Sequence, residues 1–325
     1  MKYLLPLALL ASPAMAQDKP VLTVYTYDSF VTEWGPGPAV ETAFEAVCAC
    51  DLQFVAAGDG AALLARLRLE GARTDADVVL GLDTNLTAAA AETGLFGLHD
   101  LGDVAFDLPV DWEDDMFVPY DWGYFAFVHG EDVTPPTDFR ALGESDLKIV
   151  IQDPRSSTPG LGLLLWVKAA YGDEAGAIWD GLADNIVTVT KGWSESYGMF
   201  LEGEVDMVLS YTTSPAYHLI AEGDATKSAA PFSEGHYLQI EVAATVASSD
   251  EIGLANDFLR FMVTDAFQSV IPTTNWMYPA VLPEAGLPEG FDTLIIPETA
   301  LIFPAGEATR ARDAALAEWL TALSR

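Results

Sequence analysis

Two long strand-like stretches decide the fold class of this chain: Tyr120–His129 (YDWGYFAFVH) and Tyr237–Val246 (YLQIEVAATV). Both are rich in aromatic or β-branched residues, and both are longer than a usual strand of about 5–6 residues. They interrupt shorter units in which apolar strands alternate with helical patterns, and that alternation is typical of α/β layers. We therefore interpret the two stretches as crossovers that carry the chain from one lobe to a second lobe and back.

The units on either side of these crossovers are predicted from periodicity. In the helix predicted first, Val40, Phe44 and Val47 are spaced to share one face. Later, a serine or threonine precedes proline at two expected helix starts, as in Ser157-Thr158-Pro159, which is typical of an N-cap followed by a first-turn proline. The expected strands and helices are Val21–Thr26, Pro38–Val47, Leu52–Ala56, a helix after Asp59, Asp77–Leu80, Leu147–Gln152, a helix through Ala170, Asp206–Ser210, a helix from Ala216, Phe258–Val263 and Ala308–Ser324.

The first residues form a secretory signal peptide, because Lys2 precedes a short apolar run and Ala14-Met15-Ala16 is a small-residue cleavage site. We expect a periplasmic protein of two lobes, since single cores stop growing near 250–300 residues. The segments that we expect are the leader at 1–16, lobe 1 at 17–119, lobe 2 at 120–238, a return to lobe 1 at 239–290, and a C-terminal part at 291–325 packed on lobe 2.

Acidic residues dominate the charge, with 49 Asp and Glu against 15 Lys and Arg and a formal net charge of −34. Removing the leader, whose one charged residue is Lys2, makes this −35. Such a surface repels nucleic acid and favours cationic solutes, although it is equally a solubility device. The only cysteines, Cys48 and Cys50, are compatible with a strained disulfide or with two free thiols.

Three features are candidates for a binding site. The helix starts at Ser157-Thr158 and Tyr211 to Ser214 offer hydroxyls and free N–H groups to an anion, or they are simple caps. Asp59, between Gly58 and Gly60, either caps a helix or meets a cationic or amine-bearing ligand. Aromatic residues beside loops suit a flat heterocycle or a cation, and they are Tyr27, Trp34, Trp193, Tyr211, Tyr217 and Trp276.

Sequence motifs of catalysis are missing. The histidines are scattered without metal-ligand spacing, and there is no nucleophile elbow, phosphate-binding loop or dinucleotide fingerprint. We therefore expect no enzyme activity, no metal and no cofactor.

An ordered set of motifs resembles the thiamine-binding periplasmic proteins from about Pro20 to the C-terminus. The motifs are LTVYTYDSF at 22–30, WGPGP at 34–38, DVVLGLD at 77–83, QDPRSSTPG at 152–160, TKGWSE at 190–195, LSYTTSPAY at 209–217, FSEGHY at 232–237 and NWMYP at 275–279. The resemblance implies a two-lobed type II periplasmic-binding-protein fold with the ligand cleft between the lobes.

The resemblance also implies a function. The family delivers thiamine, thiamine monophosphate or thiamine diphosphate to the membrane permease and ATPase subunits of an ABC importer, and we expect a monomer. Ligand contacts are expected from Asp59, Gly60, Ser157, Thr158, Trp193, Tyr211, Thr212, Thr213 and Ser214, with aromatic walls from Tyr27, Trp34, Tyr217 and Trp276.

Two other functions fit the same architecture. A thiamine-cleaving enzyme would need an activated cysteine in the cleft, and Cys48 and Cys50 are predicted to lie away from it. A ferric-ion binder would use paired tyrosines such as Tyr211 and Tyr217, although the Ser/Thr-rich and aromatic set exceeds what a metal site needs.

Overall fold

One mixed sheet runs through the computed structural model, which describes residues 19–324, so that the predicted signal peptide lies outside the described residues. Neighbouring strands follow the order β2 (Asp51–Ala56), β1 (Val21–Thr26), β3 (Val78–Asp83), β9 (His236–Thr245), β4 (Val118–Gly130), β7 (Met207–Tyr211), β5 (Ile149–Gln152) and β6 (Ile186–Thr190). Three short strands join this path, namely β8 (Lys227–Ala229), β10 (Tyr278–Pro279) and β11 (Ala300–Leu301).

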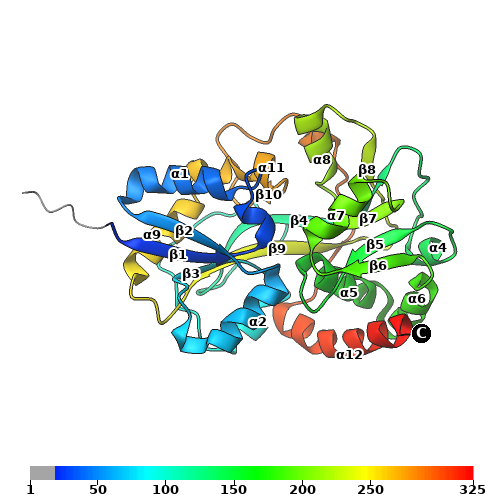
Figure 1. Cartoon of the computed structure of the whole chain (residues 1–325), viewed down its shortest axis with the longest axis horizontal. Coiled ribbons are helices and arrows are strands. Elements are labelled where there is room, and N and C mark those ends of the chain that lie inside the picture. The colour runs from blue at the N-terminus through cyan, green and yellow to red at the C-terminus, as the bar shows by residue number, and fades with distance from the viewer. Residues whose placement is uncertain (1–18, 325) are drawn as a thin grey trace, which may run out of the picture.

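The two crossover strands, β4 and β9, hold the two halves of the molecule together (Figure 1). They pair antiparallel, with Val118 to Tyr124 of β4 opposite Leu238 to Ala243 of β9. Beyond Tyr124, β4 leaves β9 and pairs with β7, while the later half of β9 pairs with β3. Each crossover strand therefore belongs to two lobes, and the two-lobed α/β fold expected from the sequence is confirmed.

Lobe 1 packs α1 (Gly37–Cys48), α2 (Gly60–Glu70) and α9 (Ile252–Met262) around β1 to β3. Its core joins Phe44 of α1 to Phe258 of α9, whose ring centroids are 5.1 Å apart. The expectation that Val47 shares the buried face was wrong, because Val47 is 73% exposed. The residues of α1 that face the core recur every four positions, at Val40, Phe44 and the half-buried Cys48. This spacing leaves Val47 on the exposed side.

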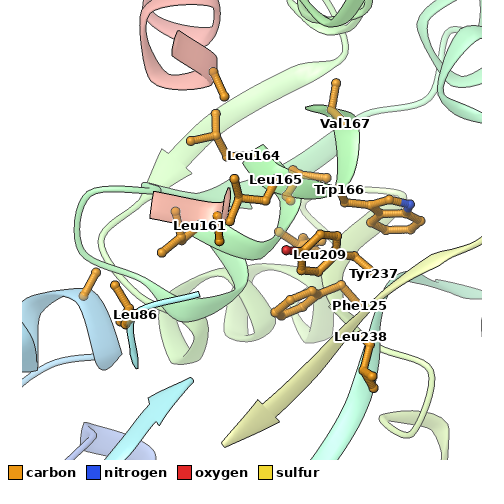
Figure 2. Close-up of a cluster of buried hydrophobic side chains, with 14 of the residues drawn as sticks. Leu86, Phe125, Leu161, Leu164, Leu165, Trp166, Val167, Leu209, Tyr237 and Leu238 are labelled. Carbon is orange, nitrogen blue, oxygen red and sulfur yellow. The ribbon is translucent and has the colours of Figure 1, made fainter. Parts of the chain in front are cut away.

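Lobe 2 is built on the apolar helix α5 (Thr158–Tyr171), and Figure 2 shows its leucines in one buried cluster with Phe125 and Tyr237 of the crossover strands. Leu161, Leu164 and Leu165 belong to one buried cluster with Phe125 of β4 and Tyr237 of β9. This close packing requires Gly162, since a Cβ at that position would lie 2.0 Å from the Phe125 ring. The core of lobe 2 therefore fixes α5, and with it the loop before α5, against the crossover strands.

The C-terminal helix α12 (Ala305–Leu323) packs on α5 and on α6 (Ala175–Leu182), where Lys168 Nζ lies 2.7 Å from Glu318 Oε1. The lobe boundaries at residues 120, 239 and 291 stay a prediction. Further helical segments are α3 (Thr87–Ala91), α4 (Phe139–Gly143), α7 (Trp193–Leu201), α8 (Pro215–Tyr217), α10 (Asp265–Gln268), α11 (Ile271–Thr274), the 3₁₀ turns Asp28–Val31, Gly71–Arg73, Gly172–Glu174 and Phe291–Thr293, and a π turn at His218–Glu222.

Cys48 and Cys50 form a disulfide at the C-terminal end of α1, which resolves the choice left open by the sequence. Within residues 19–324 we find no helix that combines the length and apolar character of a membrane span.

Candidate functional site

A cavity of about 550 Å³ lies between the lobes and receives side chains from both. Its walls are rich in aromatic side chains, and among residues 19–324 its only acidic lining residues are Asp59 and Glu241. Within the part of the chain that the structure describes, no lysine, arginine or histidine lines it. The aromatic lining consists of Tyr27, Trp34, Trp193, Tyr197, Tyr211, Tyr217 and Trp276. Such a cavity is suited to a flat, positively charged ligand.

Trp193 stands at the start of α7 and organises one wall. Its ring stacks on Tyr197, with centroids 4.8 Å apart and planes at 28°, and its Nε1 donates to Ser210 Oγ at 2.8 Å. Trp34 of lobe 1 approaches the same ring at 6.3 Å and remains 53% exposed. The two tryptophans therefore bring aromatic surface from both lobes to one end of the cavity.

Trp276 lines the cavity from an unusual backbone position. It follows α11 with φ of 57°, a left-handed conformation that costs a non-glycine residue of order 1–3 kcal/mol. Its N–H donates to Ile271 O at 3.0 Å, and its ring lies 5.4 Å from Tyr217. The turn thus places a large ring beside the cavity at the expense of local backbone stability.

Asp59 does not cap α2, although it occupies the N-cap position. Its carboxylate instead accepts from the Ser157 hydroxyl at 2.7 Å and from the Trp193 N–H at 3.2 Å, both of lobe 2. Beside it, the Gly60 N–H donates to Thr158 Oγ1 at 3.1 Å. We call this set of interlobe bonds, made by Asp59, Gly60, Ser157, Thr158 and Trp193, the clasp.

Burial raises the pKa of Asp59, and the bonds from Ser157 and Trp193 partly offset that rise. The clasp also explains why Ser157 does not cap helix α5 with its side chain, as the sequence predicted. Ser157 stands at the N-cap of α5 but makes no side-chain cap, because its hydroxyl is donated to Asp59. At the place where the sequence predicted an anion site, the Asp59 carboxylate therefore accepts the hydrogen bonds that an anion would accept.

The second hydroxyl-rich turn is also internally bonded. Ser214 makes no helix cap, because its Oγ lies 2.7 Å from Ser210 Oγ and accepts the Tyr211 N–H at 3.2 Å. The hydroxyl of Thr213 points at Met277 Sδ, 3.6 Å away, and Thr212 is fully buried. This turn shapes the wall, while its threonines lie behind it.

Most residues predicted from the sequence do line the cavity: Tyr27, Trp34, Asp59, Thr158, Trp193, Tyr211, Ser214, Tyr217 and Trp276. The cavity lining does not include Gly60, Ser157, Thr212 or Thr213. Glycine is required at position 60 by close packing, since a Cβ there would lie 2.7 Å from both Gly81 O and Thr158 Oγ1.

A group of buried and half-buried polar residues, of which only Tyr27 was predicted from the sequence, closes the cavity on the side of the crossover strands. Glu241 Oε2 accepts from Tyr120 Oη at 2.6 Å and from Tyr27 Oη at 3.2 Å. Asn275 accepts from Tyr27 Oη at 3.1 Å and donates to Asp121 Oδ2 at 2.5 Å. We call Tyr27, Tyr120, Asp121, Glu241 and Asn275 the floor.

Three carboxyl groups meet near this floor because their strands are neighbours. In the sheet register, Glu241 of β9 is paired with Asp121 of β4 on one side and with Asp83 of β3 on the other. Burial raises the pKa of Glu241 to about 7, which the two tyrosine hydroxyls partly offset, and burial raises the pKa of Asp83 to about 7. Burial and the charge of Glu241 hold the pKa of Asp121 well above its usual value.

Sequence reasoning missed these acids because they lie inside strands rather than on loops. The available signal was a charged residue within an otherwise apolar or aromatic stretch, as Asp121 in YDWGYFAFVH and Glu241 in YLQIEVAATV. Other lining residues that went unpredicted are Ser29, Pro159, Ser194, Tyr197, Gly198, Leu201, Ala221, Thr273, Thr274, Asn275 and Met277.

The chain matches known proteins over nearly its whole length. Residues 37–269 match the family model described as bacterial extracellular solute-binding protein. A relative from Salmonella typhimurium, named thiamine-binding periplasmic protein, is 55% identical over all of this chain and 99% of its own length. The corresponding protein of Escherichia coli is 54% identical, with full coverage of both chains.

A solved structure titled periplasmic thiamin binding protein superimposes with a TM-score of 0.91 at 54% identity, covering 97% of this chain and all of the other.

Proposed function

Since the chain belongs to the family of thiamine-binding periplasmic proteins, we propose that it captures thiamine in the periplasm and delivers it unaltered to the permease of an ABC importer. The carrying observation is the aromatic cavity with two lining carboxyl groups and no basic side chain from the described residues. Thiamine combines a planar aminopyrimidine with a permanently cationic thiazolium ring. Tyrosine and tryptophan faces attract such a cation, and burial in a water-poor cavity strengthens that attraction.

Phosphate esters of thiamine are included in this proposal, with the clasp as their expected site. The Ser157 hydroxyl and the Trp193 N–H are suited to an anion, and in this structure the Asp59 carboxylate accepts from both. A phosphate that reached these donors would have to displace Asp59 or approach it as a second anion. We therefore expect the esters to bind with affinity set by the balance between the new hydrogen bonds and this repulsion.

Lobe closure is the proposed mechanism. A ligand that contacts both lobes stabilises the closed form through its higher affinity for that form, and the closed form docks on the permease. The lining residues of lobe 1, such as Tyr27, and of lobe 2, such as Trp193, would then meet the same ligand. Small-angle scattering should show a smaller radius of gyration with thiamine than without it. An unchanged radius would contradict closure.

The direct test is calorimetric titration of the purified mature protein with thiamine and its two phosphates. Saturable heat with a stoichiometry of one is the expected result, supported by quenching of tryptophan fluorescence from the cavity walls. A protein that gives no heat, no quenching and no thermal shift with any of the three forms would refute the proposal.

Cleavage of thiamine and binding of ferric ion are less well supported. The only two cysteines form a disulfide and do not line the cavity, so the structure offers no thiol nucleophile there. Tyr217, one of the two tyrosines considered as iron ligands, donates its hydroxyl to Glu222 Oε1 at 2.9 Å. Incubation with thiamine followed by a search for free pyrimidine, and a visible spectrum with ferric ion, test these two alternatives.

A further inference from the structure

The floor places two buried carboxyl groups at the edge of a cavity that, among the described residues, no basic side chain lines. Glu241 lines the cavity, whereas Asp121, its partner across the β4–β9 register, is fully buried behind it. We propose that the Asp121–Glu241 pair recognises the positive charge of the ligand and releases a proton when a cationic ring docks beside Glu241. The inference rests on the proposed function, because it takes a cationic heteroaromatic compound as the ligand.

Hydrogen-bond partners of the pair show which carboxyl group carries the charge. Glu241 Oε2 accepts two phenolic hydroxyls, from Tyr120 and Tyr27, and such bonds stabilise the ionised form. Asp121 Oδ2 accepts only the Asn275 amide, Asp121 Oδ1 has no hydrogen-bond partner among the described residues, and burial and the charge of Glu241 hold the pKa of Asp121 well above its usual value. Asp121 therefore keeps a proton, and Glu241 is the group that ionises.

Other titratable groups around Glu241 supply no positive charge. The described groups that face it are Tyr27 after β1, Asp83 of β3, Tyr120 and Asp121 of β4, Tyr211 of β7, and Asp59 before α2. All of these are neutral or acidic. Glu241 is therefore either neutralised by its own proton or, once ionised, balanced by a positive charge that the ligand brings.

Proton release follows because a cationic ligand can replace the proton of Glu241. Because burial raises the pKa of Glu241 to about 7, this carboxyl is partly protonated in the empty cleft at neutral pH. A cation beside it favours the ionised form, so docking transfers the proton of Glu241 to solvent while Asp121 keeps its own. Each released proton makes the affinity rise by up to about tenfold per pH unit. The expected rise spans pH 5.5 to 7.5 and levels off above it.

The test is titration calorimetry with thiamine at pH 6.5 in buffers of different ionisation enthalpy, whose slope counts the protons released. We expect the wild-type protein to release a large fraction of one proton, roughly 0.5–0.8, given a Glu241 pKa near 7. Glu241→Gln should release none beyond what the ligand itself exchanges. It should also bind thiamine about tenfold more weakly at pH 8 but nearly as well as wild type at pH 5.5, because protonated Glu241 resembles Gln.

Asp121→Asn is the matched variant that separates the two carboxyl groups. Asparagine has the shape and the neutral charge of protonated Asp121, so this variant should still release a proton on binding thiamine. Asp83→Asn controls for a buried carboxyl that does not line the cavity and should leave the release unchanged. The uncharged aminopyrimidine without the thiazolium ring should release no proton from any variant.

Equal proton release from wild type and Glu241→Gln would overturn the inference, as would loss of release in Asp121→Asn alone. Thermal denaturation of each variant shows whether it is folded, and the comparison at pH 5.5 confirms an intact cleft. Absence of thiamine binding to the wild-type protein would instead refute the proposed function, so the two failures are distinguishable.

Discussion

The clasp and the floor each contribute one acidic side chain to the cavity lining, and they are built differently. Asp59 of the clasp lies between glycines on a loop and receives both of its hydrogen bonds from lobe 2. Glu241 of the floor lies inside a strand, and its partners Tyr27 and Tyr120 belong to lobe 1 and the adjoining half of β4. The clasp thus exists only when the lobes meet, whereas we expect the floor to be complete in the open form. The hydrogen bonds of Asp59 therefore depend on lobe closure, whereas we expect those of Glu241 to be formed before the ligand binds.

The largest expected effect concerns Asp83, a carboxyl group next to the floor. It tests whether burial of this group alone lowers the stability of the folded protein. Asp83 is fully buried, accepts from Asn85 at 2.8 Å and does not line the cavity. Its pKa is raised from 3.8 to about 7, so ionisation opposes folding above pH 7 and ceases to do so as the pH falls towards 4. Asp83→Asn should raise the unfolding free energy by up to about 4 kcal/mol at pH 8.

Denaturant unfolding at pH 8 and pH 5 checks this prediction. The gain should shrink at pH 5, where the wild-type carboxyl is already protonated in the folded protein. A gain of the same size at both pH values would show that the carboxyl charge is not its source.

The next effect concerns the ring that the clasp positions. Trp193→Ala removes the face that stacks on Tyr197 and the bond from Nε1 to Ser210 Oγ, but it keeps the N–H that Asp59 accepts. We expect thiamine affinity to fall by about 1–3 kcal/mol through lost stacking and cation–π attraction. Calorimetry measures the loss, and Trp193→Phe, which keeps an aromatic face, should recover part of it. Wild-type affinity in the alanine variant would remove Trp193 from the site.

A smaller effect separates the charge of the clasp from its geometry. Asp59→Asn keeps an acceptor for Ser157 and Trp193 but removes the negative charge. Thiamine should bind more weakly and thiamine diphosphate more tightly, so that the ratio of their dissociation constants shifts by about tenfold, or roughly 1.4 kcal/mol. Parallel titrations with both compounds give this ratio. Equal changes for the two ligands would mean that Asp59 does not discriminate against phosphate.

The smallest effect is expected from the Gly60–Thr158 hydrogen bond of the clasp. Thr158→Val removes the acceptor of the Gly60 N–H while keeping the shape of the side chain. The closed form should lose about 1 kcal/mol, because a buried donor is left without its partner. Thiamine affinity should therefore fall about fivefold, and Thr158→Ser should restore it. A fall of equal size in the serine variant would point to packing rather than to the hydrogen bond.

Sequence patterns predicted the lobes and much of the cavity wall, because those depend on local signals. Hydrophobic runs identified β1, β4 and β9, and a glycine or proline neighbour identified Trp34 and Trp193 as loop aromatics. Side-chain direction within a turn was not predictable, since tertiary contacts decide it. Thr212 and Thr213 belong to a correctly identified turn, yet both are buried behind the wall.

The floor could not be predicted, because it depends on register between strands far apart in sequence. Asp121 and Glu241 are 120 residues apart and become neighbours only when β4 pairs with β9. Nor could the capping residues at Asp59 and Ser157 be distinguished from ligand contacts by local pattern. Each occupies an N-cap position, and the partner that diverts its side chain is contributed by the other lobe.

Because β4 pairs with β9 from Val118 to Tyr124, with one register shift between Pro119 and Asp121, the joint between the lobes is a two-stranded ribbon rather than two independent linkers. The hydrogen bonds between the strands keep them side by side, so we expect opening to proceed by bending and twisting of the ribbon as one element. The stiffness of this ribbon would then help to set the rates at which the ligand is bound and released. Substitutions of ribbon residues that do not line the cavity would therefore change how fast the ligand leaves without contacting the ligand.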